Sequence, residues 1–263
     1  KETPVSALVD GHKTHAMIVM NFIAELAIKK AKESGVGIAG NFNTDESTGA
    51  LGYYVKKVAD QSLIGIAFAS APFQTTAPHG SNEAKFCTNP IAYGIPTSGD
   101  PILLDMTTSA MAYYGLIEAK TAGKEIPEGI GYDSEGKSTT NPAEVMSGAL
   151  KTIADHKGSG LALVVQVLAG VFVGADSFDN DSSNAGNLVI AIDPSIFVPS
   201  EEFKKNVSSI VTKVKSARKL EGVNEILIPG ERGNKLTKDR ESAGDIEIED
   251  NLYQELKKIA EGF

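Results

Sequence analysis

The spacing of apolar residues near the start of the chain predicts a long helix. From residue 15 to residue 34, apolar side chains recur three or four positions apart, and lysines and a glutamate occupy the opposite side. This is the pattern of a helix that packs on a core with one face. Gly35 comes directly after it, and glycine often ends a helix in the left-handed conformation. We therefore expect a helix over residues 15–34.

Three later segments carry the signals of a helix start. The Asn-Pro-Ala-Glu sequence at residues 141–144 offers a capping residue, a proline at the first helical position and an acid, and it predicts a helix towards Ala154. Ser200, followed by two glutamates, predicts a second helix, and Asp250 predicts the last one. The second would turn inward Phe203, Val207, Ile210 and Val214, and the last would carry Leu252, Leu256 and Ile259.

Short apolar runs between these helices predict strands at residues 63–68, 102–104, 188–192 and 225–228. Helices and strands therefore alternate with short connections, which favours the α/β class.

Two further segments differ from this pattern. Residues 161–175 are the most apolar part of the chain, but Gln166 and glycines interrupt them and they are too short to cross a bilayer. They predict a core helix. Residues 232–242 are densely charged and predict a mobile loop.

Composition narrows the class of protein. A chain of 263 residues is long enough to bury a substantial core. Its net charge of −9 argues against nucleic acid and against an anionic membrane as partners. The single cysteine, Cys87, excludes an intrachain disulfide framework and a multi-cysteine metal site. Since no secretory leader is visible either, we expect a cytoplasmic protein without a metal centre.

Candidate chemistry is concentrated between residues 88 and 163. Residues 102–109 are interpreted as the end of a buried strand that runs straight into a helix, with Asp105 at the junction and three hydroxyl groups in the first helical turn. A helix N-terminus offers unpaired N–H groups and a partial positive charge, which suit a phosphate or a carboxylate. At residues 157–160, a lysine and two glycines stand just before another predicted helix. Two such ends in one chain indicate an anionic ligand with extended phosphates.

Residues 35–40 match the glycine fingerprint of the Rossmann fold, with Asp60 about twenty positions further on. That fingerprint requires a strand before it and a helix after it. Here it follows a predicted helix, and Gly35 already serves as the end of that helix. We therefore reject a Rossmann turn at this position.

Five short phrases occur in the order and with the spacing seen in one enzyme family. On these phrases, the chain resembles the malate/L-lactate dehydrogenase-like oxidoreductases from about Val9 to its C-terminus. The resemblance implies a single domain over residues 1–263, with a mixed sheet, flanking helices and a nicotinamide-binding fold that is not a Rossmann fold. The phrases are Asn89-Pro90, Asp105-Met106-Thr107-Thr108-Ser109, Ile126-Pro127-Glu128-Gly129, Lys157-Gly158-Ser159-Gly160-Leu161 and Pro229-Gly230-Glu231.

The resemblance also implies which residues bind the cofactor, NAD or NADP. Without it, the same residues would be a capped helix start, a solvated lysine and a turn. A homodimer is expected as well, because the family's active sites form close to a subunit interface and dimers are the commonest closed assembly. The matching positions are Asp105, Met106, Thr107, Thr108, Lys157, Gly158, Gly230 and Glu231.

The proton donor of this family has no obvious counterpart. Hydride transfer to a 2-oxo acid needs such a donor, which is usually a histidine. None of the four histidines falls at the family's position, where this chain has Ser47 or Glu46, depending on where one extra residue is placed. Family members also carry an N-terminal helical segment with another histidine, and we expect this chain to lack that segment.

The sequence therefore predicts an oxidoreductase that transfers a hydride between NAD(P) and a small 2-hydroxy or 2-oxo acid such as malate or lactate, with malate as the expected substrate. The alternative is a non-catalytic, dinucleotide-binding homologue that has lost the acid/base histidine. Position 47 separates the two, because a serine hydroxyl hardly titrates near neutral pH unless another group activates it.

Overall fold

The structure is a computed structural model that describes residues 1–45, 47–176 and 184–262. By their contacts, these residues divide into two compact units. The first unit comprises Lys1–Pro72, Asn89–Met106 and Val164–Lys235, and the second comprises Phe73–Thr88, Thr107–Leu163 and Leu236–Phe263.

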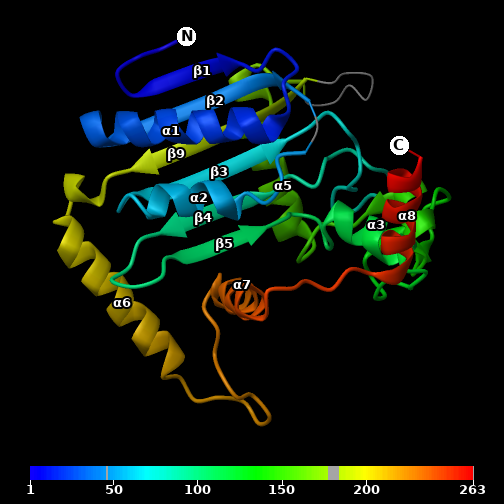
Figure 1. Cartoon of the computed structure of the whole chain (residues 1–263). Coiled ribbons are helices and arrows are strands. Elements are labelled where there is room, and N and C mark those ends of the chain that lie inside the picture. Colours follow the sequence, from blue (N-terminus) through cyan, green and yellow to red (C-terminus); the bar gives the residue numbers. More distant parts are fainter. Residues whose placement is uncertain (46, 177–183, 263) are drawn as a thin grey trace. The chain divides into compact units, whose positions relative to one another are not determined.

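Six of the described strands form the mixed sheet of the first unit (Figure 1). Their order is β1-β2-β9-β3-β4-β5; β1 and β2 run parallel, and every other neighbouring pair in this sheet is antiparallel. The latest strand in sequence, β9, thus lies between β2 and β3. The α/β class and three of the four predicted strands are confirmed. The strands are β1 (Ser6–Asp10), β2 (Val36–Thr44), β3 (Ile64–Ser70), β4 (Ile91–Ile95), β5 (Ile102–Met106) and β9 (Ala185–Ile192).

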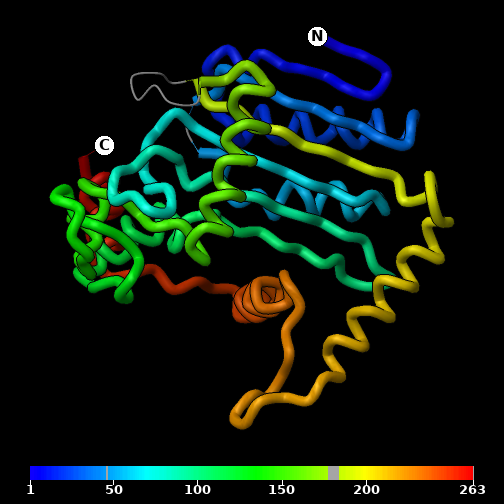
Figure 2. Tube along the Cα trace, turned by 180° about the vertical axis from the view of Figure 1, so that it is seen from behind, coloured from blue at the N-terminus to red at the C-terminus, as the bar shows by residue number. Residues whose placement is uncertain are grey.

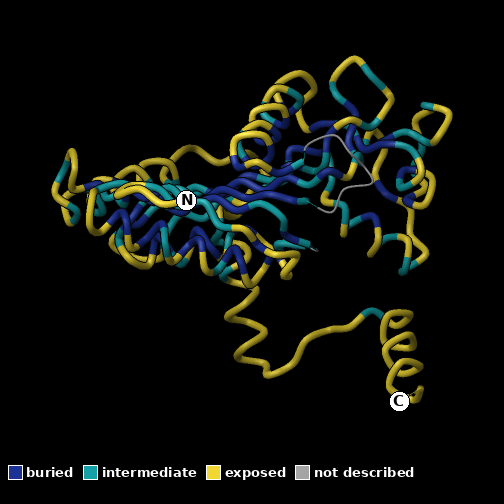
Figure 3. Tube along the Cα trace, turned by 90° about the horizontal axis from the view of Figure 1, so that it is seen from above, coloured by how far each residue is buried: buried dark blue, intermediate teal, exposed yellow. Residues whose placement is uncertain are grey.

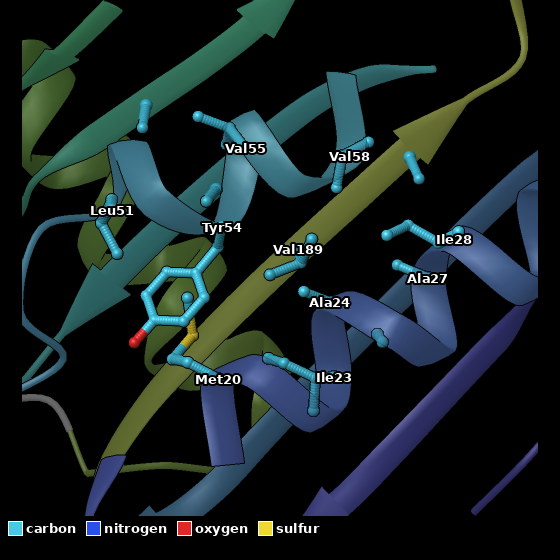
Figure 4. Packing of buried hydrophobic residues seen from close by; sticks show 14 of the residues in the cluster. Met20, Ile23, Ala24, Ala27, Ile28, Leu51, Tyr54, Val55, Val58 and Val189 are labelled. Atoms are coloured by element: carbon cyan, nitrogen blue, oxygen red, sulfur yellow. The ribbon is translucent and has the colours of Figure 1, made fainter. Parts of the chain in front are cut away.

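Two helices, α1 (Ala16–Ser34) and α2 (Gly52–Ala59), cover one face of this sheet (Figure 1). Figure 4 shows how their apolar sides gather over β9. Met20 and Ile23 of α1 and Val189 of β9 are fully buried in this cluster. The main core of the first unit therefore lies between these two helices and the sheet.

The helix α1 has the limits that its sequence predicts. His15 precedes it, and the Nδ1 atom of His15 accepts a hydrogen bond from the N–H of Met17 at 3.3 Å. Gly35 follows it with a φ of 81°, in the left-handed region, and the N–H of Gly35 donates to the carbonyl of Ala31. Gly35 therefore ends α1, as expected.

The apolar segment after residue 155 forms α5 (His156–Ala169) and a short 3-10 helix, η1 (Val171–Val173). Figure 2 shows the part of α5 that belongs to the first unit, from Val164 onward, against the sheet face opposite to α1 and α2. By length and composition, residues 156–173 are the one helical stretch among the described residues that could cross a membrane, a test that the core helix of a soluble protein also passes. Ala162, Val165, Gln166 and Ala169 are buried, whereas Leu163, Val164 and Val167 are about half exposed.

The second unit has a small sheet of its own. Among its described residues, three short strands lie in the order β7-β6-β8, next to α3 (Tyr113–Thr121) and α4 (Pro142–Ser147). The core of this unit includes the buried side chains of Leu116 and Val145. The strands are β6 (Gly131–Tyr132), β7 (Ser138–Thr139) and β8 (Ala149–Leu150).

The start of α4 is confirmed, but its predicted length is wrong. The side chain of Asn141 accepts a hydrogen bond from the N–H of Ala143 at 2.9 Å, as an N-cap should. The helix then stops at Ser147 instead of continuing to residue 154. The reason is tertiary: Ala149 pairs with Tyr132 in the small sheet, so the chain must leave the helix at Gly148.

The two predicted C-terminal helices are present as α6 (Ser200–Lys215) and α8 (Asp250–Glu261). The cap of α8 is not Asp250, as expected, but Glu249, whose carboxylate accepts a hydrogen bond from the N–H of Leu252 at 2.9 Å. The expectation that the apolar side of α6 is buried is largely wrong, because Val207 is buried but Ile210 is 60% exposed. The apolar side chains of α8 are exposed too, and Figure 3 shows this helix in the colour of exposed residues. Helical spacing predicted where these helices form but not what they contact.

Two other predictions in this region are wrong. Residues 232–242 are not a loop but part of α7 (Glu231–Ala243), whose glutamate, lysine and arginine residues favour a helix even without a buried face. Residues 225–228 do not form a strand. Strand β5 is the edge of the sheet, and the N–H of Leu103 donates one hydrogen bond there, to the carbonyl of Pro229 at 3.0 Å. A single bond of this kind does not make a ladder.

The core predicts a contrast between two isoleucines on the same helix. Ile23 is fully buried, whereas Ile18 is 65% exposed. Replacing Ile23 by alanine removes buried methylene groups and leaves a cavity, so the free energy of unfolding should fall by about 2–5 kcal/mol. Ile18→Ala should change it by roughly 0.5 kcal/mol or less. Urea unfolding followed by circular dichroism measures both, and equal losses would show that α1 does not pack as described.

Candidate functional site

Ser47 lies in the loop that joins β2 to α2 in the first unit. Its Oγ atom accepts a hydrogen bond from the N–H of Gly49 at 3.0 Å. The hydroxyl of Tyr54, a buried residue of α2, donates to the carbonyl of Thr48 at 2.7 Å. The other candidate for the proton-donor position, Glu46, lies outside the described residues. The Ser47 loop is thus fastened to α2.

Asp105 lies near the end of β5, and its carboxylate faces α2. Its Oδ2 atom accepts a hydrogen bond from the N–H of Gly52, the first residue of that helix, at 2.7 Å. Asp105 keeps contact with solvent, but the protein atoms around its carboxyl group raise the pKa above the ordinary aspartate value, and the Gly52 hydrogen bond opposes this rise. Met106, the next residue, ends β5 and pairs with Ile91 of β4.

The prediction that a helix begins directly after Asp105 is wrong. Residues 107–112 form bends and a β-bridge, and α3 starts only at Tyr113. In the second unit, the hydroxyls of Thr107 and Thr108 both donate to the carbonyl of Thr88, at 2.8 and 3.0 Å. Side-chain hydrogen bonds of this kind compete with a helix, which explains the outcome. These hydroxyls hold the backbone in place and do not line a helix N-terminus.

The same segment is joined to the start of α5 within the second unit. Ser109 forms an antiparallel bridge with Thr152, and the N–H of Ile153 donates to the carbonyl of Thr108 at 2.9 Å. The turn that follows leads directly into α5 at His156. Two phrases that lie about fifty residues apart in the sequence are therefore neighbours within the second unit.

At the start of α5, Lys157 and Gly158 have different surroundings. Lys157 is exposed, and Gly158 is buried. A side chain at Gly158 would place its Cβ atom 1.9 Å from the carbonyl oxygen of Ile153, so the turn fits only glycine. The first turn of α5, which is fully described, contains no acidic residue. A cation thus sits at the positive end of a helix, an arrangement that suits an anion.

Gly230 and Glu231 close the turn before α7. Gly230 has a φ of 96°, and a Cβ atom there would lie 2.9 Å from the Cβ of Leu103 on β5. The carboxylate of Glu231 accepts hydrogen bonds from the N–H of Ile228 and from Lys215 Nζ, at 2.9 and 2.7 Å. These two bonds, that of Lys215 first, hold the pKa of Glu231 below its ordinary value. The Glu231 side chain is therefore committed to this turn.

The structure thus assembles the predicted residues into two groups. In the first unit, the Ser47 loop and Asp105 meet at the start of α2, and Gly230 lies against β5. In the second unit, the segment of Thr107 and Thr108 is joined to the turn that carries Lys157 and Gly158.

The histidines show one neighbour pair that sequence reasoning missed. The rings of His79 and His156 lie 6.0 Å apart in the second unit, and the N–H of His79 donates to Ser159 Oγ. Their separation of 77 positions left no sequence signal. His12 is exposed and lies close to Asp10. Among the described residues, no group of three or more His, Cys, Asp or Glu side chains could hold a metal ion.

Comparison with known proteins adds a family to this geometry. The model of the malate/L-lactate dehydrogenase family matches residues 1–257. A malate/(S)-sulfolactate dehydrogenase of Methanothermus fervidus is 37% identical over 99% of this chain and 77% of its own length. A protein of Escherichia coli named ureidoglycolate dehydrogenase (NAD(+)) is 32% identical over 96% of this chain and 74% of its own length. The solved sulfolactate dehydrogenase of Methanocaldococcus jannaschii superposes with a TM-score of 0.85 at 35% identity, over 100% of this chain and 77% of that one.

The packing at the start of α5 predicts opposite outcomes for two neighbouring glycines. Gly158→Ala would force its methyl group onto the carbonyl of Ile153, so the free energy of unfolding should fall by about 1–3 kcal/mol. Around Gly160, no described atom lies within 4 Å of an added Cβ, and alanine favours a helix by about 1 kcal/mol over glycine. Gly160→Ala should therefore be neutral or stabilising. Thermal and urea unfolding test both, and a neutral Gly158→Ala variant would contradict the described turn.

Proposed function

Because the chain belongs to the malate/L-lactate dehydrogenase family, we propose that it transfers a hydride between NAD(P) and a small 2-hydroxy or 2-oxo acid such as malate or lactate. The observation that carries the proposal is the match to named dehydrogenases along nearly the whole chain. The acids in their names share a hydroxyl group on the carbon next to a carboxylate. This shared chemistry supports the substrate class, and malate is the substrate we propose first.

The residues at the start of α5 fit a dinucleotide. The exposed ammonium group of Lys157, the helix end and the glycine at 158 offer a cation, a partial positive charge and closely approachable backbone to a phosphate. The hydroxyl groups of Thr107 and Thr108 already bond to Thr88. We therefore propose that the segment of Asp105 to Thr108 contacts the cofactor mainly with its backbone.

Gly230 and Glu231 would take part through the shape of their turn, since the carboxylate of Glu231 is bonded to Lys215 and to the backbone. The names of the relatives include both NAD and NADP. We therefore propose a nicotinamide cofactor without choosing between NAD and NADP, which differ by the 2′-phosphate. A cytoplasmic homodimer remains part of the proposal, with the resemblance as its support.

In this mechanism the chain's residues bind and orient the cofactor and the substrate and exclude water, while the bound nicotinamide supplies or accepts the hydride. In the second unit Lys157 would neutralise a phosphate of the cofactor, and in the first unit the end of β5 would offer its backbone. A proton must also reach or leave the substrate oxygen. The hydroxyl of Ser47 could hydrogen bond to that oxygen, but it hardly titrates near neutral pH. Proton transfer is thus the weak step of this chain.

That weakness favours a second candidate function, a dinucleotide-binding homologue with little or no turnover. The observation that favours this second function is that Ser47 occupies the position of the family histidine. Glu46 could act as the acid only with a pKa raised by burial, and its polar sequence neighbours argue against burial. Both candidates predict cofactor binding, and they differ in turnover.

Cofactor binding is tested first with a lysine variant. NADH or NADPH added to the protein should give enhanced or blue-shifted nicotinamide fluorescence. Lys157→Ala should weaken binding by about 1.5–3 kcal/mol, roughly 10–150-fold, because one charge-assisted contact is lost. Lys120→Ala, which removes an exposed lysine from α3, is the matched control and should leave the affinity unchanged. If a folded chain binds neither cofactor, the proposal fails.

Turnover is tested by restoring the histidine. The chain itself should oxidise NADH with oxaloacetate or pyruvate only very slowly. Ser47→His should raise the rate, by up to roughly 10²–10⁴-fold, which is the usual contribution of general acid/base catalysis. Thr48→His, one position along the same loop, is the control for a misplaced imidazole. Turnover by the unmodified chain of roughly 1–10³ per second would show that the proton donor lies elsewhere.

A further inference from the structure

The first helical turn of α2 lacks a side-chain cap from the residue before it. The first N–H groups of a helix have no partner within the helix, and a polar side chain just before it usually supplies one. Here the preceding residue is Leu51, which makes no side-chain capping bond. The N–H of Gly52 is instead bonded by the carboxylate of Asp105, which is 53 positions away in the sequence. A carboxylate is well suited to this place, because it also faces the positive end of the helix.

A second bond fastens the loop before α2. Tyr54 is 3% exposed, and a buried tyrosine hydroxyl needs a hydrogen-bond partner. It finds one in the carbonyl of Thr48, at 2.7 Å. Between these two bonds, the N–H of Gly49 donates to the hydroxyl of Ser47. The loop of residues 47–51 is therefore held by Tyr54 on one side and, through Gly52, by Asp105 on the other.

The backbone and the side chain of Asp105 point in different directions. Leu103 turns its N–H to the open edge of β5, where it meets Pro229. Along a strand, residues two apart turn their backbone groups to the same edge, so Asp105 does likewise. The carboxylate of Asp105 instead projects from the face of the sheet and accepts the hydrogen bond from Gly52 of α2. Ala92, the neighbour of Asp105 on β4, brings no titratable group.

We infer that Asp105 is a positioning residue, whose carboxylate caps α2 and, together with the Tyr54 hydroxyl, holds the loop that carries position 47 at the start of α2. The inference rests on the proposed function, in which the end of β5 contacts the cofactor and position 47 faces the substrate. Asp105 would then have two roles: its backbone would contact the cofactor, and its side chain would hold the loop of residues 47–51.

Amide hydrogen exchange on the cofactor-free chain tests the cap directly. In Asp105→Ala, the amides of residues 49–52 should exchange at least tenfold faster. Asp105→Asn should stay close to the unmodified chain, because an amide oxygen can still accept the bond from Gly52. Tyr54→Phe should speed exchange in residues 47–49. Asp60→Ala is the control, since Asp60 pairs with Lys56 at the far end of the same helix. Unchanged exchange at Gly52 in Asp105→Ala would overturn the inference.

The pH response of Gly52 tests whether the partner of its N–H is an ionisable carboxylate. The protein atoms around the carboxyl group of Asp105 raise its pKa by partial desolvation, so this group should keep its proton to a higher pH than an ordinary aspartate. The amide proton resonance of Gly52 should follow that ionisation, with a midpoint above the ordinary value. The titration should disappear in Asp105→Asn. A Gly52 resonance that titrates equally in both proteins would contradict a bond to this carboxylate.

Cofactor titration separates this inference from the proposed function. In the Ser47→His background, Asp105→Ala should lower kcat, and Asp105→Asn, which keeps an acceptor for Gly52, should restore it. If the unmodified chain binds no cofactor, the proposed function fails, and the exchange and pH measurements still decide whether Asp105 is a cap. A tenfold loss of NADH affinity in both Asp105→Ala and Asp105→Asn, with normal exchange at Gly52, would make the carboxylate a direct ligand and overturn the inference.

Discussion

The packing of α1 and α2 over β9 is the constraint on which the rest of the first unit depends. β9 comes late in the sequence but lies between β2 and β3, so the sheet is complete only after most of the chain has been used. Once Val189 is buried under α1 and α2, the ends of β2 and β5 and the start of α2 are fixed. The loop of Ser47 and the carboxylate of Asp105 therefore gain their places from apolar contacts in which neither takes part.

The polar groups near the candidate site are satisfied mostly by the protein itself. Thr107 and Thr108 bond to Thr88, and the carboxylate of Glu231 bonds to Lys215. Such internal bonds hold the backbone in one arrangement before a ligand arrives, which lowers the entropy lost on binding. What remains for a ligand is mainly backbone and the exposed Lys157. Under the proposed function, such a site would recognise the shape and charge of phosphates more than a pattern of side chains.

The sequence predicted those features that local rules decide. The limits of α1 follow from its apolar spacing and from Gly35, and the N-cap at Asn141 follows from its side chain. The prediction was wrong where residues far apart in the sequence interact. The helix α4 ends early because Ala149 pairs with Tyr132. The segment after Asp105 is bent because the hydroxyls of two threonines donate to the carbonyl of Thr88. For the same reason, the candidate site could be predicted only in part from the sequence. Its residue types could be matched to a family one by one, but the bond between Asp105 and Gly52 spans 53 positions and has no sequence signal.

Family membership and catalytic competence are separate questions for this chain, because different residues answer them. The family is carried by the core and by phrases such as that of Lys157, which keep the fold and the charge that suit a dinucleotide. Competence depends on a single group that can exchange a proton near neutral pH. At position 47 the chain has a hydroxyl, yet it keeps the loop fastened by Tyr54 and the helix capped by Asp105. The loop is thus held in place although its residue at position 47 is a poor acid, so under the proposed function the limit would lie in the chemistry of one side chain and not in the scaffold around it.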